Sequence, residues 1–131
     1  MSMFTALNAA QSGATLADTW MTAIAHNIAN SNTVLPPGVP PFRAQQVHAT
    51  PAGGMTGVRV SSISERAGEP DRVYDPGNPL ADEDGYVTRP VVDMTTELTG
   101  LVVAQRLYQA NLSVHKQVTE SYRNALSIGR S

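Results

Sequence analysis

The chain has 131 residues, a formal net charge of −2, only 15% charged residues and no cysteine. The length suits one ordinary domain, and the lack of cysteine excludes disulfides, zinc-thiolate sites and thiol nucleophiles. The nine Lys and Arg residues are scattered, which excludes the clustered basic surface of a nucleic-acid-binding protein. No window of 18 apolar residues occurs, so we expect no membrane span.

Proline and glycine divide the chain into three segments. All nine prolines and seven of the ten glycines lie within residues 34–90. We therefore expect an N-terminal helix over residues 1–33, a β-strand and loop region over residues 34–90, and a C-terminal helix over residues 91–131. The predicted fold is mainly α with a small β-rich insertion, its two long helices paired as an antiparallel, coiled-coil-like hairpin.

The first segment carries an apolar seam at alternating spacings of four and three residues, the heptad pattern of helices that pack side by side. Asp18 is the single formally charged residue among the first 33. Two interpretations stay open, a core helix of a small bundle and a helix buried between neighbouring subunits; the missing charge favours the second. The seam consists of Met3, Leu7, Ala10, Ala14, Ala17, Met21, Ile24 and Ile28.

The middle segment predicts short strands separated by turns. Runs rich in β-forming residues occupy residues 42–48, 58–63, 72–74 and 86–89, so we expect a small, irregular antiparallel sheet. Residues 82–85, Asp-Glu-Asp-Gly, suggest a calcium loop, but the glycine stands at the wrong position for an EF-hand. A hairpin turn is the favoured interpretation.

The last segment predicts a second long helix. Asp93 and Glu97 stand near its start, where acidic side chains favour the helix dipole. The apolar frame slips between residues 101 and 107, which indicates a rotating seam or more than one partner. Its apolar positions include Met94, Leu98, Leu101, Leu112, Val114 and Val118.

The two helices have similar predicted lengths, roughly 45 and 55 Å. Because these lengths are similar, we predict that the helices form an antiparallel pair with the middle segment folded at one tip. Because the seam of the first helix is rich in alanine, a lone hairpin buries little apolar surface. We therefore predict that the helical ends are poorly ordered in the monomer and fold on assembly.

Catalytic motifs are missing from the sequence. His26, His48 and His115 are isolated, and neither a metal-binding histidine pair nor a phosphate-binding glycine loop occurs. We expect no enzyme activity, no cofactor and no metal site.

Residues 21–33 resemble the N-terminal signature of the flagellar axial proteins, the family of rod, hook and hook-associated proteins. Residues 41–47, 73–87 and 90–93 are similar to stretches of its proximal-rod members. The signature residues that carry the resemblance, and to which it assigns subunit packing, are Asn27, Ile28, Ala29, Asn30, Tyr108, Gln109, Ala110 and Asn111.

The resemblance implies a structural subunit of the bacterial flagellar basal-body rod. Such subunits polymerise with copies of themselves and with related rod proteins into a tube that transmits torque and conducts exported subunits. The paired helices line the inner tube and the middle forms an outer layer. The resemblance also implies passage through the flagellar type III export apparatus without cleavage of the N-terminus, which here lacks the features of a secretory signal peptide.

Alternatives remain at two levels. The chain could be a neighbouring rod subunit of the same family, or a helical-hairpin adaptor of a type III secretion system. An adaptor would carry a charged outer face, which the first 33 residues lack. Asn27 and Asn30 have two interpretations: local caps that end the helix, or groups that hydrogen-bond across subunits.

Overall fold

The computed structural model describes residues 3–54 and 56–129. Two long helices flank a middle of short strands and loops, which confirms the predicted fold class. The elements in chain order are α1 (Met3–Ala29), β1 (Gln45–Pro51), β2 (Val58–Glu65), β3 (Asp71–Tyr74), β4 (Tyr86–Arg89) and α2 (Met94–Ile128).

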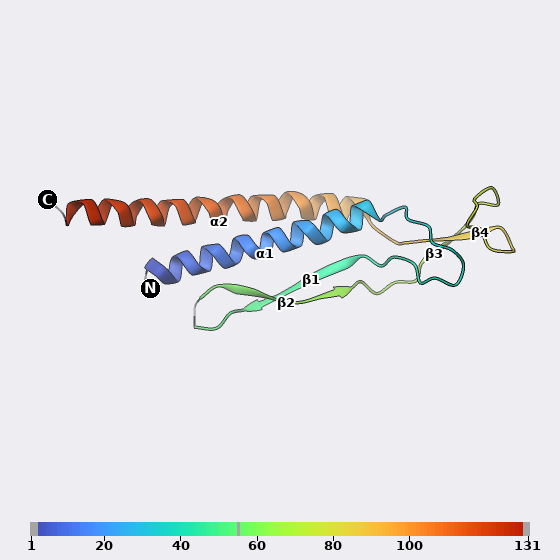
Figure 1. The fold of residues 1–131 in the computed structure, drawn as a ribbon, viewed down its shortest axis with the longest axis horizontal. Helices are drawn as coiled ribbons and strands as arrows, with labels where there is room; N and C mark the ends of the chain where they lie inside the picture. The colour runs from blue at the N-terminus through green and yellow to red at the C-terminus, as the bar shows by residue number, and fades with distance from the viewer. Residues whose placement is uncertain (1–2, 55, 130–131) are drawn as a thin grey trace.

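The helices α1 and α2 run antiparallel, side by side, in the elongated molecule of Figure 1. Gly13 of α1 packs against Asn111 of α2, and Asn27 of α1 bonds to Glu97 of α2. The two contacts are 14 residues apart on each helix (27 − 13 and 111 − 97), so the pairing keeps one register along the hairpin.

The apolar core is small because alanine dominates it. A Cβ atom built on Gly13 would lie 2.5 Å from Oδ1 of Asn111, so a larger residue here would force the Asn111 carboxamide to move. Short side chains at the interface bring the helices close but remove little apolar surface from water. The buried apolar residues are Ala10, Ala14, Ala17, Ala23, Ile24, Ala44, Val87 and Ala104.

The face of α2 that meets α1 keeps an unbroken heptad spacing. Seven of its buried and half-buried positions recur every four and three residues, and the other three, Gly100, Leu107 and Thr119, lie next to them, so the frame slip predicted from the apolar residues does not occur in the burial pattern. The seven regularly spaced positions are Glu97, Leu101, Ala104, Tyr108, Asn111, His115 and Val118. Because several of them carry polar or small side chains, a search for large apolar residues does not find them.

The middle forms two separate two-stranded antiparallel sheets instead of one small sheet. In the first, β1 pairs with β2 and a bulge interrupts the register between His48 and Ala49. In the second, β3 pairs with β4. The first strand begins at Gln45, three residues later than predicted, because Phe42 packs its ring against His26 of α1, with the ring centroids 5.4 Å apart.

The β1–β2 hairpin lies back along α1, and β3–β4 extends beyond the end of the helical pair (Figure 1). The expectation that the whole middle folds at one tip was therefore wrong. Ser12 provides the physical reason, since its hydroxyl accepts a hydrogen bond from the Val58 backbone N–H at 3.1 Å. Gly57 (φ +106°) lies so close to α1 that a Cβ there would come within 2.9 Å of the Ala9 Cα.

Residues 82–85, which include the acidic residues, form a turn directly before β4, as predicted. The Gly85 N–H donates to the Asp82 carbonyl at 3.0 Å, and Gly85 adopts φ +80°. The Asp82 carboxylate accepts from the N–H groups of Tyr86 (2.8 Å) and Asp84 (3.1 Å) and pairs with Arg72. The bond from Tyr86, foremost, holds the pKa of Asp82 below its usual value.

Candidate assembly site

Asn27 joins the two helices to the first hairpin. Its side chain is 1% exposed, and its Oδ1 accepts from the Gln45 N–H at 2.7 Å. Its Nδ2 donates to the Gln45 carbonyl at 2.9 Å and to Oε2 of Glu97 at 3.1 Å. The carboxamide thus pairs with both backbone groups of Gln45 as a neighbouring strand would, and ties the start of β1 to α1 and α2.

Glu97 is the second residue of this connection between the helices and the first hairpin, which we call the joint. It is 3% exposed, and its Oε1 accepts from the Arg66 guanidinium at 3.1 Å. A buried carboxylate needs a cation and hydrogen-bond donors, because removal from water otherwise penalises its charge. Arg66 follows β2 directly, so the network of Asn27, Gln45, Arg66 and Glu97 fixes the hairpin relative to the helical pair.

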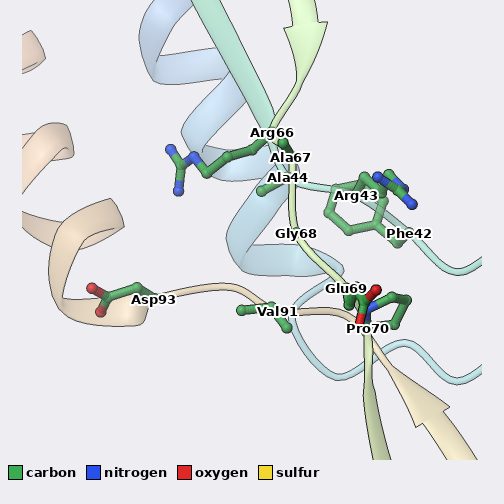
Figure 2. Close-up of a pocket in the computed structure, with 10 residues that line it drawn as sticks. All are labelled: Phe42, Arg43, Ala44, Arg66, Ala67, Gly68, Glu69, Pro70, Val91 and Asp93. Carbon is green, nitrogen blue, oxygen red and sulfur yellow. The ribbon is translucent and has the colours of Figure 1, made fainter.

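A shallow cavity of about 150 Å³ lies beside the joint, between the chain before β1, the chain after β2 and the start of α2 (Figure 2). Its lining contains no Ser, Thr, Cys, His, Lys or Tyr, and its two acidic residues are Glu69 and Asp93. The lining residues are Phe42, Arg43, Ala44, Arg66, Ala67, Gly68, Glu69, Pro70, Val91 and Asp93.

Asp93 in this lining is the N-cap of α2. Its Oδ1 accepts from the Thr95 N–H at 3.0 Å and its Oδ2 from the Thr96 hydroxyl at 2.7 Å. The hydrogen bond from the Thr96 side chain is the main reason that the pKa of Asp93 lies below its usual value. The carboxylate therefore serves to start a helix.

The two asparagines of the N-terminal signature differ in their roles. Asn30 caps the end of α1, because its Nδ2 donates to the His26 carbonyl at 2.9 Å. The cap interpretation is wrong for Asn27, whose side-chain bonds go to β1 and α2. Between them, Ile28 is half-buried and Ala29 is exposed.

The C-terminal signature contributes one tight contact. The Asn111 carboxamide packs over Gly13 and donates to the Leu107 carbonyl of its own helix at 2.8 Å. Tyr108 is half-buried towards α1, and both Gln109 and Ala110 are exposed.

The predicted seam residues separate into two groups. Ala14 and Ile24 are buried, and Leu7, Met21, Leu101 and Val118 are half-buried. Met3, Leu98 and Leu112 are exposed. The structure brings the first group together along the hairpin and leaves the second group available to other molecules.

The outer faces of α2 present apolar side chains to solvent. The exposed fractions of these large apolar side chains range from 40% at Met94 to 75% at Ile128. Helical spacing places Leu98, Val102 and Leu112 on one side of α2 and Val103 and Val114 on a second side, roughly 150° around the helix. Exposed apolar side chains grouped in this way mark interaction surfaces. The outer apolar set of α2 is Leu98, Val102, Val103, Leu112 and Val114.

Sequence reasoning missed several residues of the joint and of the helix contact. Gln45 and Arg66 carried no signal, since their partners are distant along the chain. Gly13 did carry one, because an isolated glycine inside a helical pattern often marks a close approach. Ser12 gave none beyond its place beside the seam.

Several known proteins are similar in sequence to this chain over most of its length. The family model described as the flagellar basal body rod FlgEFG protein C-terminal matches residues 83–128, which include β4 and α2. The chain is 40% identical over 110 residues to the flagellar basal-body rod protein FlgC of Salmonella typhimurium, covering 81% of this chain and 82% of that protein. The chain belongs to the FlgC family of flagellar basal-body rod proteins.

Other FlgC proteins match across the full chain. The FlgC of Escherichia coli O157:H7 is 35% identical over 134 residues, covering 99% of this chain and 100% of that protein. The FlgC of Bacillus subtilis is 30% identical over 150 residues, again covering 99% and 100%. The similarity therefore includes both helices and the middle of the chain. Within residues 3–54 and 56–129, no helix is both long enough and apolar enough to cross a membrane.

Proposed function

We propose that this chain is a structural subunit of the flagellar basal-body rod. Copies of it polymerise with related rod proteins into a tube that transmits torque and conducts exported subunits. The likeness to FlgC proteins along the whole chain supports the rod assignment. The exposed apolar side chains of α2 carry the polymerisation, because a soluble monomer does not need them.

In the assembled rod, residues 1–33 and 91–131 form the inner-tube domain and residues 34–90 form the outer layer. The geometry supports this division in two ways. The helices form one elongated hairpin, and the β1–β2 hairpin lies against α1 while the joint of Asn27, Arg66 and Glu97 ties it to both helices. An outer layer fixed rigidly to each helical pair allows the tube to rotate as one body.

The chain reaches the rod through the flagellar type III export apparatus without cleavage of its N-terminus. A small core favours this route, since a chain that buries mostly alanine costs little to unfold. The basal-body location and the export route belong to one proposal and are tested together.

The test is the location of a tagged copy. In cells that lack the native gene, a tagged chain should restore swimming and copurify with isolated basal bodies at a fixed number per basal body. Mass spectrometry of that material should find the N-terminal peptide intact. A chain that restores swimming but stays outside the basal body would contradict the proposal.

A further inference from the structure

Asp18 and Arg106 are charges that the chain does not use internally. Asp18 is the single formally charged residue of α1, and both side chains are exposed. Across residues 3–54 and 56–129, the basic members of the ion pairs are Arg66, Arg72, Arg89 and Lys116. Asp18 and Arg106 therefore remain available to another molecule.

These two charges lie at the same level of the helical hairpin. Asp18 comes five residues after Gly13, and Arg106 comes five residues before Asn111, the residue that packs on Gly13. Because α1 and α2 are antiparallel in constant register, equal steps in opposite directions end at one height. A copy placed beside the first without an axial shift would bring one charge level with the other.

The two charges also point away from the shared interface. Arg106 follows the buried Ala104 by two residues, about 200° around the helix, and so lies on the side of α2 opposite to α1. Asp18 belongs to an exposed row on α1 that repeats every three and four residues. That row is Asn8, Gln11, Thr15, Asp18, Thr22 and Ala25.

Side-chain size on both faces suits close packing of helices. The side chains of the α1 row are short and, apart from Asp18, uncharged; on α2, Val102, Val103, Gln109 and Ala110 surround Arg106. Helices with such side chains pack at interaxial distances of about 8–10 Å. An α2 face of apolar and uncharged polar side chains with one cation then meets a small, polar α1 face with one anion.

We propose that the outer face of α2 packs laterally, without axial shift, on the outer face of α1 of a second copy of this chain, with Arg106 paired to Asp18 of that copy. The inference rests on the proposed rod function and assigns its lateral contact. The occupant is a second copy because both complementary halves lie on this chain at one height. The contact is heterologous, so it repeats from copy to copy.

Charge reversal tests the pair. Arg106→Glu or Asp18→Lys alone should lower the amount of tagged chain in isolated basal bodies about tenfold or more, because like charges then meet across the interface. The double variant Asp18→Lys/Arg106→Glu should return to within about twofold of the native chain. Arg123→Glu, an exposed cation elsewhere on α2, is the matched control and should assemble normally. Single variants that assemble normally, or a double variant that is not rescued, would overturn the proposal.

Cysteine cross-linking identifies the neighbour. The chain has no cysteine, so a variant with Asp18→Cys and Arg106→Cys carries the only two. Oxidation of isolated basal bodies should give a ladder of covalent multimers of this chain, and neither single-cysteine variant should give one. A cross-link to a different rod protein, or no cross-link in basal bodies that contain the chain, would overturn the lateral contact and leave the rod function intact. Absence of the native tagged chain from basal bodies would overturn the rod function itself.

Discussion

The two helices differ in how much of each is covered. In α1, seven residues are buried among 27; in α2, two are buried among 35. The first helix packs against both α2 and the β1–β2 hairpin, whereas the second contacts α1 along one face. Because α2 keeps most of its apolar side chains in water, we expect assembly to bury more apolar surface on α2 than on α1.

The largest expected effect concerns the order of the two helices in the monomer. We expect backbone amides of residues 112–128 to exchange with deuterium at least about 100-fold faster than those of residues 14–27, because few buried contacts protect them. Hydrogen exchange with mass spectrometry on the dilute monomer measures this. Uniform protection of both helices, with one cooperative melt, would contradict both this comparison and the prediction of folding on assembly.

The joint comes next in expected size. Asn27→Leu should lower the free energy of unfolding by about 3–5 kcal/mol, because it leaves the Gln45 backbone groups and the buried Glu97 carboxylate short of partners. Urea unfolding followed by circular dichroism measures the change. Asn30→Leu removes an exposed capping bond to His26 and a bond from the Thr33 hydroxyl, and should cost about 1 kcal/mol or less. An equal decrease in the free energy of unfolding for the two variants would contradict a stabilising role of the joint.

The close approach of the helices predicts a smaller, coupled effect. Gly13→Ala should cost about 1–2 kcal/mol, since overpacking against Asn111 outweighs the better helix propensity of alanine. In the Asn111→Ala background the same change should become neutral or stabilising, a coupling that a double-mutant cycle of urea midpoints detects. Gly100→Ala, whose Cβ would lie 3.2 Å from the Ile24 Cδ1, is the milder control.

Acid should act on the start of α2 before it acts on α1. The pKa of Asp93 is lower in the folded chain than in the unfolded chain, so its capping contribution is complete above the unfolded value and disappears as the pH falls through the folded value. Hydrogen exchange of residues 94–100 should therefore rise below about pH 4. Asp93→Asn, which keeps a capping oxygen without the charge, should remove that part of the pH dependence.

The smallest expected effect on the monomer is at the outer surface of α2. Leu112→Gln should change the free energy of unfolding by less than about 0.5 kcal/mol, because Leu112 is 46% exposed. Leu101→Gln, the same substitution on the half-buried side facing α1, should cost about 1–3 kcal/mol. In cells, Leu112→Gln should still reduce swimming. Normal motility would show that this part of α2 is not an interface.

The sequence by itself determined the number, type and order of the helices. Proline and glycine confined the breaks to residues 34–90, and heptad spacing is a local property that burial in α1 reproduces at Ala10, Ala14, Ala17 and Ile24. The turn at Asp82–Gly85 was predictable for the same reason, since its hydrogen bonds are made within a few residues.

Only the tertiary structure decided where the middle lies and what Asn27 does. Partners 18 and 70 residues away, Gln45 and Glu97, consume its carboxamide, and no local pattern encodes such distances. The polar seam positions of α2, such as Glu97 and Asn111, depend likewise on what α1 places opposite them. Periodicity records which face of a helix is apolar, whereas a buried hydrogen bond depends on two segments meeting in space.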